Sequence, residues 1–257
     1  ISKDGKLVIK LNYQRESHKA IFNPDNGEPS TIFDVKYQGT ITQPIKNPTK
    51  QGYVFAGWEG YSGSIMGTAD ITYKAKWDPD RETIYTVKHI RQDLSGNFIE
   101  NGSLVETETK IGTTDAQTEA EIKNYPGFTP ETVTQTRILP DGTAEVKIKY
   151  SRNNYTVNWV VDGYNYKTEQ VKYEDTIIVP SANPTKEGYV FASWSGYGAG
   201  ATMGISEQNF TANWNPATNT KYTARHLRED LGGNYTIVEL ENKTGITEKI
   251  VPEVVMA

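Results

Sequence analysis

Twelve residues that occur twice place the strongest constraint on how this chain can fold. Residues 47–58 read NPTKQGYVFAGW and residues 183–194 read NPTKEGYVFASW, so ten of the twelve positions are identical between the two copies. Self-similarity of this kind is the signature of a repeat architecture. A length of 257 residues would by itself suggest one or two domains. The repeat instead predicts several small modules.

The duplicated segment combines turn residues with a short strand. Proline restricts φ to a narrow negative range and glycine accepts positive φ, so the first half favours turns. Its second half is rich in aromatic and β-branched residues and predicts a strand. Because side chains alternate along a strand, Tyr53 and Phe55 are expected on one face. The other face then takes Val54, Ala56 and Trp58. A strand that is apolar on both faces is expected inside a small domain, although its aromatic rings could instead form an exposed platform for a sugar or protein ligand.

The repeats alternate between two types. The duplicated segment defines A modules, which we expect at residues 18–78 and 153–216. The intervening residues 79–152 form a B module. Residues 1–17 match the end of a B module, and residues 217–257 match its beginning. The predicted order is therefore partial B, A, B, A, partial B.

Two details support this division. The Asp4-Gly5 turn and the strand ending at Tyr13 recur as Asp141-Gly142 and a strand ending at Tyr150, and Asp-Gly between β-prone segments is a strong hairpin signal. The linkers at 78–80 and 215–218 are short and contain proline, which favours a semi-rigid rod.

The composition favours strands over helices. The chain has 16 tyrosines and 5 tryptophans besides abundant threonine and valine. Residues 71–77 alternate strictly, with Ile71, Tyr73, Ala75 and Trp77 expected to face inward. Residues 40–45 could form one helical turn, and residues 114–122 could be a short helix or another strand. The expected fold class is mainly β with some helix (α+β), in an elongated tandem array of small modules.

Charge and composition exclude several classes of function. A net charge of −5 leaves no basic surface for nucleic acid. No run of about 18 apolar residues exists, so no membrane insertion is expected. Cysteine is absent, which removes disulfides, thiolate chemistry and cysteine-ligated metals.

The residues that carry catalysis do not form a recognisable constellation. Only His18, His89 and His226 exist, and the last two occupy the same repeat position. No cluster has metal-ligand spacing, and no helix pattern follows the glycine-rich stretch 196–200. We therefore expect no enzyme activity, no catalytic residue, no metal site and no cofactor. Isopeptide cross-links from lysines such as Lys10 or Lys147 remain open, and a mass loss of about 17 per bond, one ammonia, would reveal them.

The A module resembles the Listeria–Bacteroides repeat, also called the internalin B-repeat. The resemblance rests on Val35-Lys36-Tyr37, Pro48 to Trp58 and Tyr73 to Trp77, and on the matching residues of the second copy. The B module is similar to mucin-binding-protein-type (MucBP-like) repeats, through residues 85–89 and 141–150. Together the resemblances cover nearly the whole chain. They imply β-grasp-like modules in the extracellular part of a bacterial, Gram-positive surface protein, anchored by segments outside this chain.

Two functions follow as expectations. The first is a non-enzymatic stalk of an adhesin that spaces a distal binding domain from the cell. The alternative is a binding module for host surface glycan, mucin or receptor protein, with Tyr61 and Tyr197 as contact candidates. The partial modules at the two ends could associate head to tail between molecules by strand addition, or could simply be one repeat divided. The aromatic residues predicted to fill the module cores are Tyr53, Phe55, Trp58, Trp77, Trp159, Tyr189, Phe191, Trp194 and Trp214.

Overall fold

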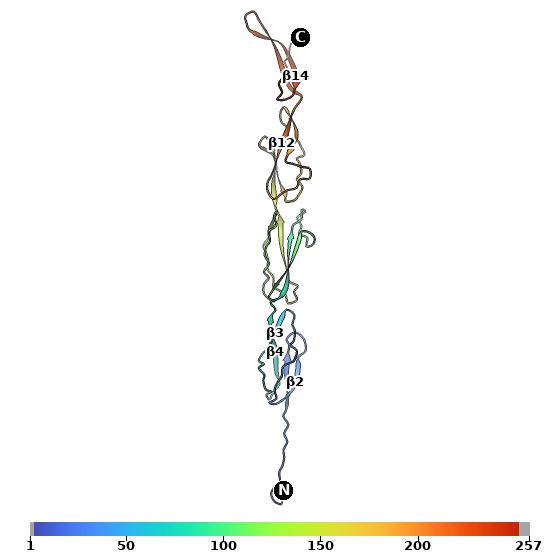
Figure 1. Ribbon diagram of the computed structural model, residues 1–257, viewed down its shortest axis with the longest axis vertical. Helices are drawn as coiled ribbons and strands as arrows, with labels where there is room; N and C mark the ends of the chain where they lie inside the picture. The colour runs from blue at the N-terminus through green and yellow to red at the C-terminus, as the bar shows by residue number, and fades with distance from the viewer. Residues whose placement is uncertain (1–2, 252–257) are drawn as a thin grey trace. The chain divides into compact units, whose positions relative to one another are not determined.

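The computed structural model of the protein describes residues 3–251, and its regular structure is entirely β. These residues form fourteen strands in four sheets and no helix. In Figure 1 each sheet is coloured as one continuous stretch of the chain, which is the arrangement expected of tandem repeats. The outermost parts of the two predicted end segments, residues 1–2 and 252–257, lie outside the described residues.

The four sheets are formed by strands within residues 17–79, 83–152, 154–216 and 220–245. The first A module contains β1 (Ser17–Asn23), β2 (Thr31–Lys36), β3 (Tyr53–Trp58) and β4 (Ile71–Pro79). The B module contains β5 (Thr83–Arg91), β6 (Val105–Gly112), β7 (Phe128–Pro130) and β8 (Glu145–Arg152). The second A module contains β9 (Asn154–Val161), β10 (Tyr164–Lys172), β11 (Tyr189–Ser195) and β12 (Gln208–Pro216). The last sheet contains β13 (Thr220–Glu229) and β14 (Tyr235–Gly245).

The chain can also be divided by how its residues pack together, and this gives two compact units. The first unit holds β1 to β4, β6, most of β5 and the first half of β8. The second holds β7, the end of β8 and β9 to β14. The division runs through the B module, so each A module is packed in one unit with part of the B module.

Both A modules have the same sheet. In the first, β1 pairs antiparallel with β2 and parallel with β4, and β4 pairs antiparallel with β3, so the order is β2-β1-β4-β3. The second has the order β10-β9-β12-β11 with the same strand directions. In β4 the predicted alternation holds for Tyr73 and Ala75, which are buried, whereas Ile71 is 37% exposed.

An aromatic side chain fills the centre of each A module. Phe22 is fully buried, and its ring lies 5.0 Å from that of Trp58 and 5.1 Å from that of Tyr73. Trp159 occupies the equivalent place in the second module, and its ring lies 5.1 Å from that of Trp194. Rings of this size bury about 150–250 Å² each, so they dominate the stability of small modules.

Trp58 lies on the opposite face of β3 from the one that simple alternation predicts. The pairing of β3 with β4 shifts between Phe55 and Gly57. This β-bulge inserts one extra residue and turns Trp58 to the face of Phe55, whose ring it meets at 5.3 Å. Val54 and Ala56 are exposed, so the prediction of a strand with two apolar, buried faces is wrong. The second A module has the same shift in β11.

The helical elements considered from sequence are not formed. Residues 40–45 contain no helical turn: Thr40 pairs with Ile65, and Ile41 inserts into the core with 1% of its surface exposed. Residues 114–122 form neither a helix nor a regular strand. The helical part of the α+β expectation and the β-grasp comparison are therefore not confirmed. Within residues 3–251 there is also no helix that could cross a membrane.

The two partial B segments differ from the complete module. Residues 6–13, predicted as a strand, form none and are exposed. Their counterpart β8 lies between β5 and β7, and a backbone segment becomes a strand only when a neighbour satisfies its hydrogen bonds. At the other end, β13 pairs only with β14 among the described residues, and apolar side chains such as Leu227 and Leu240 are exposed there.

Candidate functional site

Each of the repeated histidines lies beside a glutamate of its own strand pair. His89 is fully buried, and its Nε2 lies 3.8 Å from Oε2 of Glu108. In the last sheet, Nε2 of His226 lies 3.7 Å from Oε1 of Glu241. Neither pair includes a nucleophile, so the geometry is that of a buried strand histidine rather than a catalytic dyad.

The last sheet also holds a candidate ligand set that the sequence did not suggest. His226, Glu239 and Glu241 each offer one ligand atom, and these atoms lie within 4.8 Å of one another. Lys243 already forms an ion pair with Glu241 and, together with His226, lowers the pKa of that carboxyl. The carboxylate of Glu241 is thus already engaged by a lysine, so the group is better described as an ion pair on β14 with a histidine of β13 beside it.

The two tyrosines proposed as ligand contacts use their hydroxyls within their own modules. The hydroxyl of Tyr61 donates to the carbonyl of Ile41 at 3.0 Å, and that of Tyr197 donates to the carbonyl of Ile177 at 3.2 Å. Both rings pack against the aromatic cores. This placement gives both residues a structural role, and their contact with a ligand stays a prediction.

Seven of the nine aromatic residues predicted in the cores lie in or against the two core clusters. The members are Trp58, Trp159 and Trp194, which are buried, and Phe55, Trp77, Phe191 and Trp214, which are partly buried. Tyr53 and Tyr189 belong to neither cluster. They lie instead at the ends of the A modules, where the next B segment begins.

A continuous series of hydrogen bonds joins the first A module to the B module. The N–H of Asp80 donates to the carbonyl of Gly52 at 2.9 Å, and the N–H of Thr114 donates to the carbonyl of Asp80 at 2.8 Å. The hydroxyl of Tyr53 donates to Oδ2 of Asp115 at 2.7 Å. Residues from both modules thus share one hydrogen-bonded network, which we call the A-to-B junction.

The A-to-B junction is built a second time, where the second A module meets the last sheet. The N–H of Ala217 donates to the carbonyl of Gly188 at 2.8 Å, and the N–H of Thr247 donates to the carbonyl of Ala217 at 2.9 Å. The hydroxyl of Tyr189 donates to Glu248. Glu248 and Asp115, its counterpart in the first junction, both have positive φ, of 62° and 69°. The same contacts therefore occur at two places in the chain, which indicates that the residues of the A and B modules determine this junction.

Hydrogen bonds and charge hold one carboxyl of the first junction ionised. The hydroxyl of Tyr53, followed by Arg137 and Lys50, lowers the pKa of Asp115. The same hydrogen bond raises the pKa of Tyr53. The folded pKa of Asp115 therefore lies below that of the unfolded chain, about 3.9. Its carboxylate stabilises the junction above that pH, and the contribution is lost as the pH falls through the folded value.

We expect acid to weaken the contacts of the first junction. The substitution Asp115→Asn should remove this dependence on pH. The NMR shift of the Thr114 amide, followed from neutral pH downward, should titrate in the wild type and stay flat in the variant. Asp141 is a matched control, because hydrogen bonds from Thr143 within its own turn lower its pKa. Asp141→Asn should leave the Thr114 titration in place. An unchanged titration in Asp115→Asn would contradict the assignment.

Arg152 joins the B module to the second A module. Its side chain is only 3% exposed, and Nη1 donates to the carbonyl of Tyr173 and to Oε2 of Glu174, each at 2.7 Å. Its Nε donates to the carbonyl of Gln92 at 3.2 Å. The guanidinium also lies 4.7 Å from the ring centroid of Phe128, within cation–π range. One buried side chain therefore ties three segments together, in what we call the B-to-A junction.

Part of the B-to-A junction recurs near the start of the chain. Nη1 of Arg15 donates to the carbonyl of Tyr37 at 3.3 Å, and the N–H of Tyr37 donates to the carbonyl of Glu16 at 2.8 Å. Sequence reasoning missed this arginine as a junction residue. The signal was available, because Arg15 and Arg152 each stand just before an A module that has a tyrosine, Tyr37 or Tyr173, at the matching place.

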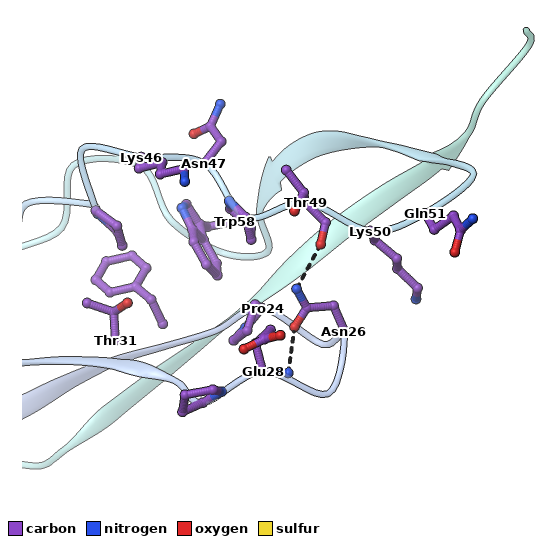
Figure 2. Close-up of a pocket in the computed structure, with 14 residues that line it drawn as sticks. Pro24, Asn26, Glu28, Thr31, Lys46, Asn47, Thr49, Lys50, Gln51 and Trp58 are labelled. Carbon is purple, nitrogen blue, oxygen red and sulfur yellow. Dashed lines mark hydrogen bonds between the residues drawn. The ribbon is translucent and has the colours of Figure 1, made fainter. Parts of the chain in front are cut away.

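The first A module also has a groove of about 500 Å³ beside Trp58. Its walls are the loop before β2 and the loop before β3, as Figure 2 shows. Nδ2 of Asn26 donates to the carbonyl of Thr49 at 2.8 Å, and Nζ of Lys50 lies 3.3 Å from the carbonyl of Asp25. These bonds tie the two loops to each other and fix the width of the groove.

A protein of Evansella cellulosilytica is similar in sequence to this chain. It is named as a candidate membrane protein and is 28% identical over 209 residues. The match covers 73% of this chain but only 29% of the relative, so the chain spans about three tenths of the relative's length.

Two solved structures each match about half of this chain. The crystal structure of Mub-RV matches with a TM-score of 0.17 and 12% identity, over 54% of this chain and 99% of that one. Domains 3–4 of the Streptococcal High Identity Repeats in Tandem (SHIRT) of a cell surface protein match with a TM-score of 0.20 and 16% identity, over 52% and 99%. TM-scores this low support no inference about this chain.

A family profile matches both A modules. The Listeria-Bacteroides repeat domain aligns with residues 18–76 and again with residues 155–226, together just over half of the chain. The two aligned segments contain both copies of the duplicated strand, the two aromatic clusters apart from Trp77, and the tyrosines of both A-to-B junctions. The chain therefore belongs to the Listeria-Bacteroides repeat domain family.

Proposed function

We propose that the chain is a non-enzymatic stalk region of a bacterial cell-surface adhesin, which spaces a distal binding domain from the cell. The observation that carries this proposal is the duplicated A-to-B junction. A stalk gains length by stacking modules that each contact only their neighbours, so its specific features are the contacts between successive modules. A binding or catalytic domain would need only one copy of its site.

Short connections between the modules support the same proposal. A single residue, Asn153, separates β8 from β9. Its N–H donates to the carbonyl of Gly127 at 2.9 Å, and its carbonyl accepts from the N–H of Tyr173 at 2.8 Å. A connection this short, hydrogen-bonded on both sides, restricts rotation of one module against the next.

The finer parts of the proposal have indirect support. We propose that residues 79–152 are a MucBP-like module, and that residues 1–17 and 217–257 are parts of such modules, in alternation with the A modules. A location on the bacterial surface fits the repeat family and the candidate membrane protein of Evansella cellulosilytica. Segments outside this chain would provide the anchor. Recognition of host glycan through Tyr61 and Tyr197 has less support, because both hydroxyls are engaged inside their modules.

Small-angle scattering tests the stalk proposal. A nine-residue strand is about 30 Å long, so four modules in line should extend over roughly 120 Å and give a radius of gyration of roughly 35 Å. A compact chain of this length would have a radius of gyration of about 18 Å. We expect a value near the larger figure, and one near the compact figure would contradict a stalk.

The same measurement over a concentration series tests self-association. We propose that residues 6–13 of one molecule can pair with β13 of another, as their counterpart β8 lies beside β5 in the B module. Within the B module the N–H of Thr86 in β5 donates to the carbonyl of Ala144 just before β8, and bonds of this kind would form between the molecules. A particle mass that rises with concentration is expected, and a constant monomer mass would exclude this pairing.

A further inference from the structure

The two A modules differ beside their duplicated tryptophans. In the second module the pairing of β9 with β10 shifts between Asn165 and Lys167, so Tyr166 is an extra residue in the strand. Its ring lies 6.0 Å from that of Trp194 at an interplanar angle of 37°. Its hydroxyl donates to the carbonyl of Ala182 at 3.3 Å. Tyr166 therefore covers Trp194 and is held there by a hydrogen bond.

In the first module the residues near Trp58 correspond to those near Trp194, but no counterpart of Tyr166 is present. Alignment of the two duplicated segments makes Trp58 the counterpart of Trp194 and Lys46 the counterpart of Ala182, and both Trp58 and Lys46 line the groove described above. The pairing of β1 with β2 has no shift, and Ser30 stands at the position of Tyr166. The place that a phenol ring fills in one module is thus an open groove in the other.

We propose that the groove beside Trp58 binds a tyrosine side chain presented by an extended peptide segment of a partner protein. The ring would lie against Trp58, and its hydroxyl would donate to the carbonyl of Lys46, as Tyr166 does to Ala182. The second module supplies the argument for this occupant, because the chain itself closes the equivalent place with a tyrosine.

The walls of the groove suit a peptide. Polar side chains of Asn26, Glu28 and Asn47 are among those that line the groove (Figure 2). Polar groups at the rim can hydrogen-bond the backbone on either side of the inserted ring. The bond from Asn26 to Thr49 keeps the walls in place, so little ordering is required on binding. The apolar part of the lining includes four prolines, namely Pro24, Pro29, Pro44 and Pro48.

Binding of N-acetyl-tyrosine amide to the whole chain tests the proposal. A ligand of this size should bind with a dissociation constant of about a millimolar. The buried indole nitrogens of Trp58 and Trp194 both lack a hydrogen-bond partner among the described residues, so their N–H signals in an NMR spectrum are matched reporters. We expect the Trp58 signal to shift on titration and the Trp194 signal to stay. N-acetyl-phenylalanine amide, which lacks the hydroxyl, should bind several-fold more weakly.

A variant of the second module provides the internal control. Tyr166→Ala opens the equivalent groove, so the Trp194 signal should gain a response while the Trp58 response remains. Tyr166 is 43% exposed, so its removal should leave the module folded. The proposal is overturned if the wild-type Trp58 signal does not move up to about 20 mM ligand, well above the expected constant. Equal responses at both tryptophans of the wild type would also overturn it, as would N-acetylglucosamine shifting Trp58 at concentrations similar to the tyrosine amide.

Discussion

Trp159→Ala is expected to unfold the second A module and to leave the first A module intact. Trp159 is fully buried, contacts the rings of Trp194 and Phe210 at 5.1 and 4.9 Å, and donates Nε1–H to Glu169. Truncating a buried aromatic residue to alanine costs about 3–5 kcal/mol of unfolding free energy. A module of this size has only about 3–10 kcal/mol in total. The substitution therefore removes a large part of the stability of that one module.

Hydrogen exchange followed by mass spectrometry can localise the effect. Peptides from residues 154–216 should lose protection, whereas peptides from residues 17–79 should keep it, because each module has its own core. Val190→Ala is the control, since Val190 lies in β11 of the same module with 56% of its surface exposed. It should change stability by less than about 0.5 kcal/mol. If Trp159→Ala lowered protection equally in both A modules, the modules would unfold as one unit and the independent-core interpretation would be wrong.

The strands of the A modules follow from the sequence, but the face of Trp58 does not. Local patterns indicated the strand that carries it, because aromatic and β-branched residues stand between glycines. The bulge between Phe55 and Gly57 depends on pairing with β4, which lies further along the chain. Alternation within a single strand contains no information on such a shift, and one residue of shift exchanges the two faces.

The junction residues were missed for a related reason. Tyr53 and Tyr189 lie in an apolar strand, so the pattern assigned them to the core. Only the neighbouring module supplies their partners, Asp115 and Glu248. In a chain of repeats, a residue at a module end can look like a core residue while it serves the contact between modules. A comparison of both copies of the junction, rather than of one strand alone, would have revealed the tyrosine and carboxylate pairs.

Gly52→Ala is expected to break the first A-to-B junction while both modules stay folded. Gly52 has φ of 73°, and a Cβ there would lie 2.5 Å from Cα of Pro140 in the B module. Backbone atoms at that distance must move apart, so the bond from Asp80 to Gly52 and the bond from Tyr53 to Asp115 should both be lost. A left-handed alanine adds about 1–2 kcal/mol of strain in the A module itself.

Gly163→Ala separates the strain from the collision with the neighbouring module. Gly163 also has positive φ, 84°, but a Cβ there would meet no atom within 4 Å. Both variants should lower the stability of their own A module by a similar amount, about 1–2 kcal/mol. Only Gly52→Ala should also remove exchange protection from the amides of Asp80 and Thr114, which bond across the junction. If those amides stayed protected in Gly52→Ala, glycine would be required at position 52 only for its backbone conformation. The close approach of Pro140 would then have no part in coupling the modules.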